Sequence, residues 1–276
     1  MINLNLITLA IFSQLILTLV PVGIKISNSN IWEIGFFRLV VAIAVLFPFS
    51  KNDFLKHIKK TWPLGVLFSF HWLTYAHSVK VSGPSTAVIG LSFYGIILLF
   101  YSKVFLNKKI RPIFFFFIII AIISTKMVVE KRTDLIGLGW GILSSLFYAG
   151  LPIINIKNSV IPSDKRAYSQ FLVALIFYSI IGAPFISVDN LILDWRILLA
   201  LGLGGTLVGH GLWLKVTTYL PTTISGGFYY LAIPLSITYE FLFFPAHIGL
   251  NKVVGASLIV ASNLGIVYYQ NKELRE

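Results

Sequence analysis

The chain has 276 residues, of which 57% are hydrophobic and 12% charged, and it contains no cysteine. Soluble domains have about 45–50% apolar and about 25% charged residues, so this composition argues against a soluble enzyme, a disordered chain and a nucleic-acid-binding domain. A helix needs about 20 apolar residues to cross the hydrocarbon layer of a membrane. Ten such helices would fill most of the chain and leave no room for a globular domain outside the membrane.

Hydrophobic runs separated by polar clusters predict ten membrane-spanning helices. In chain order, they cover residues 4–25, 31–48, 62–79, 85–105, 112–128, 135–155, 168–187, 196–214, 222–244 and 253–270. The first run lacks the basic start and the small-residue cleavage site of a signal peptide, so we expect it to be the first span.

Lysine and arginine are distributed unevenly over the connections between these helices. Fourteen lie on the side that holds both termini, seven lie on the other side, and Arg38 lies within a span. Short cytoplasmic loops retain basic residues, so this bias predicts a multi-pass cell-membrane protein with both termini in the cytoplasm. In a bacterium with two membranes, the inner membrane is expected. The net charge of +12 then reflects membrane topology, and nucleic acid is not an expected partner.

The two halves of the chain match at an offset of 131 residues for helices 1 and 6, and of 138 for helices 3–4 and 8–9. Matched pairs are Ser13 with Ser144, Pro21 with Pro152, Trp72 with His210, Tyr75 with Trp213 and Ser85 with Thr223. Because five helices per half is an odd number, the second half must enter the membrane from the opposite side. We expect an all-α integral membrane protein with ten transmembrane helices, built as two inverted five-helix repeats over residues 1–130 and 131–276. A solute site is expected near mid-membrane between the halves.

Two segments of the second half resemble a known transporter family. Gly137–Gly150 reads GLGWGILSSLFYAG, and Leu201–Leu242 joins a glycine-rich helix through the turn Leu220-Pro221-Thr222 to a helix that contains Pro234. Both are similar to the EamA-type branch of the drug/metabolite transporter superfamily. Gly255-Ala256 and Arg38 also resemble the family pattern, in helices 10 and 2.

The resemblance implies ten helices, cytoplasmic termini and transport of a small solute. The chain departs from the family at two features. The proline of helix 9 has no partner in helix 4, where Ile96 takes its place. The other feature is a Gly-Glu pair that the family usually has just after helices 4 and 9. Asn107-Lys108 and Pro245-Ala246 stand there instead, so no role of those glutamates carries over.

Polar and aromatic side chains form stripes on three predicted helices. Residues with helical spacing share one face, and the stripes are Phe68, Trp72 and Tyr75; Thr206, His210 and Trp213; and Tyr229, Ala232, Ser236 and Glu240. Together they predict an aromatic-walled cavity that suits a planar or cationic solute. The residues predicted to bind the solute are Gln14, Trp72, Tyr75, Tyr94, Tyr148, His210, Trp213 and Tyr229. The alternative is that these rings face lipid.

Glu240 and Arg38 are the candidate charge or coupling sites. Glu240 is expected at the outward mouth of the cavity, where it would attract a cation or bind a coupling proton; alternatively, it lies at the outer interface. Arg38 either binds an anionic group or holds helix 2 in place through hydrogen bonds to carbonyls. Gly205 and Gly209 have the small-xxx-small spacing that lets membrane helices pack closely.

These features favour a secondary transporter that moves a small organic metabolite or drug-like solute by alternating access. The chain has no Walker A sequence, so ATP-driven transport is not supported, and neither a cofactor nor a metal is expected. The expected partners are the solute and the lipid bilayer, and a homodimer is left open. The alternatives are a membrane scaffold or receptor without transport, and a lipid enzyme. The enzyme predicts clustered acids or histidines near one interface, which the sequence lacks.

Overall fold

The structure is a computed structural model that describes residues 4–49, 54–107, 109–220, 222–244 and 248–273. These residues form helices and short connections, and no β-strand occurs among them. The first half contains α1 (Leu4–Ile26), α2 (Ile31–Leu46), the 3-10 helix η1 (Phe47–Phe49), α3 (Phe54–Ser82), α4 (Pro84–Leu91), α5 (Tyr94–Leu106) and α6 (Pro112–Val128). The second half contains α7 (Arg132–Lys157), α8 (Ser163–Ile181), the 3-10 helix η2 (Ala183–Phe185), α9 (Val188–Leu193), α10 (Trp195–Ala200), the π-helix η3 (Leu201–His210), α11 (Gly211–Tyr219), α12 (Thr222–Tyr229), α13 (Ala232–Phe243) and α14 (Leu250–Glu273).

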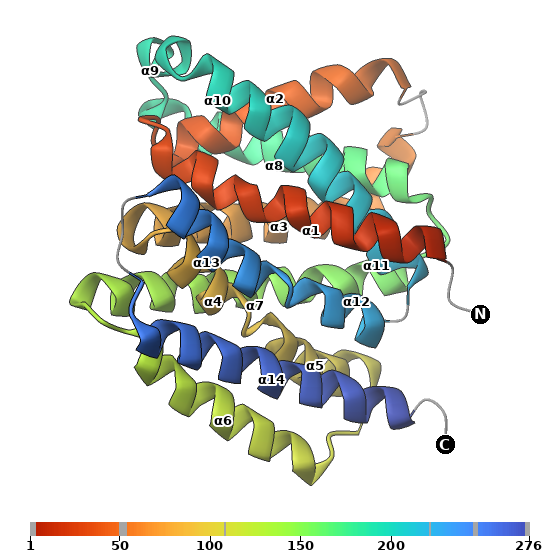
Figure 1. The fold of residues 1–276 in the computed structure, drawn as a ribbon. Coiled ribbons are helices and arrows are strands. Elements are labelled where there is room, and N and C mark those ends of the chain that lie inside the picture. The colour runs from red at the N-terminus through yellow and green to blue at the C-terminus, as the bar shows by residue number, and fades with distance from the viewer. Residues whose placement is uncertain (1–3, 50–53, 108, 221, 245–247, 274–276) are drawn as a thin grey trace.

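The helices lie side by side in one bundle, with α6 and α14 along one edge and α2 and α10 toward the other (Figure 1). The start of α1 and the end of α14 lie at the same end of this bundle, which we call the terminal end. The opposite end, where α9 lies, is called the distal end.

The distribution of side chains is that of a protein in lipid. Within the described residues, five stretches are long and apolar enough to cross a membrane: Leu4–Ile26, Pro84–Leu106, Arg132–Lys157, Trp195–Tyr219 and Leu250–Tyr269. Large apolar side chains cover the outside; Phe116 on α6, for example, is 57% exposed. Polar side chains such as Ser13, Gln14 and Thr18 are buried instead. Outward apolar groups are favourable only in an apolar solvent, and the protein is therefore a multi-pass membrane protein.

Each predicted hydrophobic run coincides with helix, but several ends differ. The run 62–79 belongs to α3, which begins eight residues earlier, and the run 196–214 continues as helix to Tyr219. These helical extensions contain polar residues such as Lys59. Hydropathy detects only the apolar part of a helix, whereas the helical hydrogen bonds continue beyond it. The run 168–187 corresponds to α8, which ends at Ile181 before Pro184 in η2. Lys108, Pro221 and Pro245-Ala246, which bear on the family resemblance, lie outside the described residues.

Two of the long rods are broken near their middle. α4 and α5 are separated at Ser92–Phe93, and α12 and α13 at Tyr230–Leu231. Pro234 explains the second break, because proline lacks an N–H and crowds the carbonyl four residues earlier. The first break has no proline and was not predicted. A Cβ on Gly95 would collide with the hydroxyl group of Tyr230, so the two breaks touch each other.

Gly205 and Gly209 allow η3 to pack closely against α1, as their spacing predicts. A Cβ on Gly205 would lie 2.5 Å from Cγ2 of Val20, and one on Gly209 would lie 2.9 Å from Cδ2 of Leu17. This close approach brings η3 and α1 together around the middle of the bundle.

Candidate functional site

A cavity lies in the middle of the bundle, between helices of both halves. Its walls come from α1, α2, α3, α4, α7, η3, α12 and α13. The polar and aromatic lining residues are Gln14, Thr18, Arg38, His71, Trp72, Tyr75, Tyr148, His210 and Tyr229. Among the described residues, neither aspartate nor glutamate lines this central cavity.

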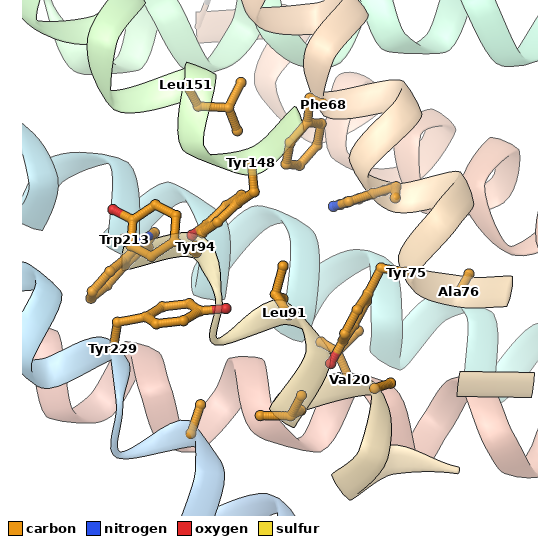
Figure 2. Close-up of a cluster of buried hydrophobic side chains, with 14 of the residues drawn as sticks. Val20, Phe68, Tyr75, Ala76, Leu91, Tyr94, Tyr148, Leu151, Trp213 and Tyr229 are labelled. Atoms are coloured by element: carbon orange, nitrogen blue, oxygen red, sulfur yellow. The ribbon is translucent and has the colours of Figure 1, made fainter. Parts of the chain in front are cut away.

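One wall of the central cavity is built from Tyr148 and Tyr229, and Tyr94 packs against both from outside the cavity lining, near the helix breaks. Figure 2 shows Tyr94, Tyr148 and Tyr229 grouped together beside Trp213. The ring centroid of Tyr94 lies 4.9 Å from that of Tyr229 and 5.0 Å from that of Tyr148. Tyr94 is the first residue of α5 and Tyr229 the last of α12, so the two breaks place these rings at mid-depth. Such a wall can stack against a planar group or attract a cation.

Arg38 is held in a fixed position on another side of the cavity. Its Nε donates a hydrogen bond of 3.0 Å to Oγ1 of Thr206, and its guanidinium carbon lies 3.8 Å from the centre of the Trp72 ring. Thr206 lies in the π-helix η3, and its hydroxyl donates to the carbonyl of Leu201, five residues earlier. π-Helical turns are rare and frequently occur at functional sites. Here the turn positions the oxygen that accepts from Arg38.

Two serine hydroxyl groups join helices through equivalent carbonyls on either side of the cavity, and Ser144 also makes a hydrogen bond of 2.7 Å with Nδ1 of His71. Ser13 on α1 donates to the carbonyl of Gly209 over 2.9 Å, and Ser144 on α7 donates to the carbonyl of His71 over 2.9 Å. The serines are 131 residues apart and the carbonyls 138 apart, which are the two offsets found in the sequence. α1 thus contacts η3 as α7 contacts α3.

A second pocket continues from the central cavity toward the terminal end. Tyr148 and His210 line both spaces. The other polar and aromatic residues of this terminal pocket are Phe68, Asn155, Gln170, Trp213 and Thr217. The rings of Phe68 and His210 meet edge to face, with centroids 5.0 Å apart. These rings form part of the boundary between the two spaces.

Hydrogen bonds around Asp194, at the start of α10, join several helices at the distal end. Its carboxylate accepts from the hydroxyl of Ser27 over 2.7 Å and from the backbone N–H of Ser29 over 2.6 Å. Lys80 at the end of α3 donates to the carbonyl of Ser27. Burial alone raises the pKa of Asp194, but hydrogen bonds from Ser27, Ser29 and Asn28 outweigh it and hold the pKa below its usual value. The network ties α1, α3 and α10 together.

Two glutamates also have partners at the distal end. Glu33 accepts from the backbone N–H of Asn30 over 2.7 Å and from that of Ser187 over 2.9 Å, which caps α2. Glu240 accepts from the N–H of Ser85 over 2.7 Å at the start of α4, and its carboxylate lies 3.6 Å from Nζ of Lys252. Glu240 is not part of the cavity lining. A role for it in attracting or coupling a charge stays a prediction.

The structure brings most of the predicted solute-binding residues together. The central cavity is lined by Gln14, Trp72, Tyr75, Tyr148, His210 and Tyr229, and also by Arg38. Trp213 lines the terminal pocket instead, and Tyr94 packs against Tyr148 and Tyr229 without lining either space. Their role in binding stays a prediction.

The predicted set of binding residues left out His71, although its position in the sequence is near mid-membrane, and also Thr18 and the apolar lining residues. His71 precedes Tyr75 by four residues, so helical spacing could have placed it on the same face. Leu17, Val20 and Ile24 on α1 gave no signal. An apolar helix face has the same pattern whether it borders a cavity or lipid.

An all-helical membrane protein with a central cavity between its two halves has the architecture of many small-solute transporters. Residues 135–268 match the model of the EamA-like transporter family. With this match and the transporter relatives below, the chain is a secondary transporter of a small metabolite and not an enzyme.

Proteins of related sequence and fold agree with this assignment. The chain is 22% identical over 258 residues to an S-adenosylmethionine uptake transporter of Rickettsia felis, covering 88% of this chain and 85% of the relative. It is 21% identical over 258 residues to the transporter of the same name from Rickettsia conorii, with the same coverage. A solved crystal structure shares the fold, with a TM-score of 0.67, 12% identity and coverage of 99% of this chain and 100% of the other.

Proposed function

We propose that the chain moves its solute through ten membrane-spanning helices arranged as two inverted five-helix repeats, over residues 1–130 and 131–276. Three of the spans are composite rods, formed by α4 and α5, by α10, η3 and α11, and by α12 and α13. α1, α2, α3, α6, α7, α8 and α14 supply the others. The terminal end is then cytoplasmic, because it carries the excess of lysine and arginine.

The paired hydrogen bonds of Ser13 and Ser144 carry the proposal of an inverted repeat. They join equivalent helices through equivalent carbonyls, at the offsets of the sequence alignment. The helix breaks at Ser92–Phe93 and Tyr230–Leu231 are likewise 138 residues apart. Helix contacts agree at the level of whole rods, because α7 packs on α3 and on the rod of α4 and α5, while α1 packs on η3 and on the rod of α12 and α13.

The solute is proposed to bind in the central cavity. Its binding residues are Gln14, Trp72, Tyr75, Tyr94, Tyr148, His210, Trp213 and Tyr229. S-Adenosylmethionine is the first solute to consider, because the relatives from Rickettsia bear its name. The tyrosine wall suits such a molecule, since its planar base can stack on aromatic rings and its sulfonium cation can contact their faces.

Access is proposed to alternate between the two ends. The Asp194 network closes the distal end, whereas the terminal pocket extends the central cavity toward the cytoplasm. Opening the distal end would require α1, α3 and α10 to separate. The rings of Tyr148 and His210 would have to close the opposite route.

Flux through vesicles tests this function. The purified chain is reconstituted in liposomes, and entry of labelled S-adenosylmethionine is compared with entry of amino acids, amines, nucleosides and sugars. Protein-dependent flux of at least one solute is expected. Tyr229→Ala should reduce it several-fold, whereas Trp195→Ala, which changes a 48% exposed side chain, should not. Absence of flux for every solute would favour a scaffold or receptor.

Labelling of single cysteines tests the orientation, because the natural chain has none. In cells, Asp189→Cys should react with an impermeant reagent added outside, since Asp189 lies in α9 at the distal end. Lys59→Cys near the terminal end should be protected. The reverse pattern would place the termini outside.

A further inference from the structure

Two hydrogen-bond donors of the central cavity have no partner among the residues that the structure describes. Nη2 of Arg38 and Nε2 of Gln14 are buried and make no hydrogen bond to the residues that the structure describes. Both side chains line the cavity, and they are only 3% and 1% exposed. Unpaired buried donors are costly, most of all when they carry charge. Groups of this kind are suited to be satisfied by a bound solute.

The positive charge of Arg38 is not balanced by an acidic side chain. The cavity lining contains neither aspartate nor glutamate within the described part of the chain. Glu33 caps α2. Glu240 accepts a hydrogen bond from Ser85 and forms an ion pair with Lys252 at the distal end. The cavity therefore favours a negative group, even though its aromatic wall alone would suit a cation.

The guanidinium of Arg38 is held in an orientation that suits the binding of an anion. Thr206 holds Nε and the Trp72 ring covers one face, so Nη2 is left for a ligand. A Cβ on Gly205 would lie 3.4 Å from Nη2, and glycine at this position keeps that space open. A planar, pre-oriented guanidinium matches the geometry of a carboxylate.

We infer that the transported solute carries a carboxylate and that Arg38 and Gln14 bind it, while the aromatic wall holds the organic remainder. This assignment rests on the proposed function, because it requires the central cavity to be the solute site. One guanidinium offers one positive charge, which balances a carboxylate. It would leave the dianion of inorganic phosphate only half neutralised.

Binding to matched acid and neutral probes tests the assignment without requiring transport. The purified full-length chain is titrated calorimetrically with S-adenosylmethionine and its decarboxylated form, with L-phenylalanine and L-phenylalaninamide, and with inorganic phosphate. At least one acid should bind tenfold or more tightly than its partner without the carboxylate, and phosphate should bind more weakly than that acid.

Variants then locate the preference. Arg38→Gln should abolish it, and Gln14→Leu, which removes only the second donor, should reduce it several-fold. Arg166→Gln is the matched control, because this second buried arginine lines neither space. It should keep the preference of the natural chain, even if its stability falls. If Arg38→Gln does not fold, the natural chain and Gln14→Leu still give the comparison.

Three results would overturn the assignment: equal binding of acid and neutral probes, a preference that survives in folded Arg38→Gln, or no binding by any acid. The flux measurement separates this assignment from the proposed function. Arg38-dependent binding without flux would contradict transport alone. Flux without a carboxylate preference would contradict the carboxylate site alone.

Discussion

The ends and the middle of the bundle both bury charged side chains, but they treat hydrogen bonds differently. At the distal end, Asp194 and Glu33 each accept several hydrogen bonds, and at the terminal end Arg166 donates to Asn155 and Thr218. In the middle, Nη2 of Arg38 and Nε2 of Gln14 have no partner among the described residues, and both side chains line the central cavity. Nε of Arg166 also lacks a partner there, but Arg166 lines neither the central cavity nor the terminal pocket. In this transporter, buried charge therefore does not by itself indicate function. The distinguishing feature is an unpartnered donor that borders a cavity.

The largest expected effect compares the two buried arginines. Nη1 of Arg166 donates to the carbonyl and side-chain oxygens of Asn155, each over 3.0 Å, and Nη2 donates to Thr218 over 2.8 Å. Arg166→Met should lower the free energy of unfolding by about 3 kcal/mol, because these charged donors are lost. Arg38→Met should cost less than about 1 kcal/mol, since it also removes an unpaired charge. Denaturation in detergent measures both, and equal losses would contradict the distinction between ends and middle.

The next effect concerns the distal network. Asp194→Asn should destabilise the protein by about 2 kcal/mol at pH 7, because the asparagine oxygen is a weaker acceptor than a carboxylate. The pKa of Asp194 is lowered in the folded state, so its stabilisation is fully present above the unfolded value of about 3.9 and is lost as the pH falls through the lower folded value.

Stability measured between pH 7 and pH 3 checks this. The difference between the natural chain and Asp194→Asn should stay constant above about pH 5 and shrink below about pH 4. A difference that does not change with pH would exclude the carboxylate as its source.

Glu240→Gln should have a smaller effect, a loss of about 1 kcal/mol. The amide oxygen can still accept from Ser85, but the contact with Lys252 loses its charge. Lys252→Met should give a similar loss of stability. The pH dependence of solute flux tests the predicted coupling role of Glu240: a change in Glu240→Gln supports this role, and an unchanged dependence contradicts it.

The smallest effect tests the equivalence of the halves. Ser13→Ala removes one hydrogen bond to a helix carbonyl, and such bonds within membranes contribute about 0.6 kcal/mol on average. Ser144→Ala removes the equivalent bond to the carbonyl of His71 and also the contact of 2.7 Å with Nδ1 of His71, so its loss should be larger, about 1 kcal/mol. Denaturation in detergent measures both losses. A Ser144→Ala protein as stable as the natural chain would contradict the predicted stabilisation by these bonds.

The helices could be predicted because each apolar run leaves a strong signal in a chain with few charges. The break at Ser92–Phe93 could not, since no proline marks it and its geometry depends on packing against Tyr230. The hydrogen bonds at the distal end could not be predicted either. Glu33 on α2 and Lys80 on α3 are visible in the sequence, but their partners Ser187 and Ser27 are distant along the chain.

Helical spacing was enough to place Trp72 and Tyr75 on the cavity face of α3 and His210 on the cavity face of η3. Helical spacing could not predict the ion pair of Glu240 with Lys252, because this pair depends on the relative orientation of α13 and α14. The missing partner of Nη2 of Arg38 is also invisible in sequence, since it becomes evident only when every neighbour has been placed.

The contact between the two helix breaks has a consequence for cooperativity. The hydroxyl of Tyr230 occupies the space beside Gly95 that a side chain would fill, so a bend in one broken rod meets the other directly. Neither rod can straighten or slide without displacing its counterpart. The halves should then switch together in one concerted step, and intermediates with a single half rearranged should be sparsely populated.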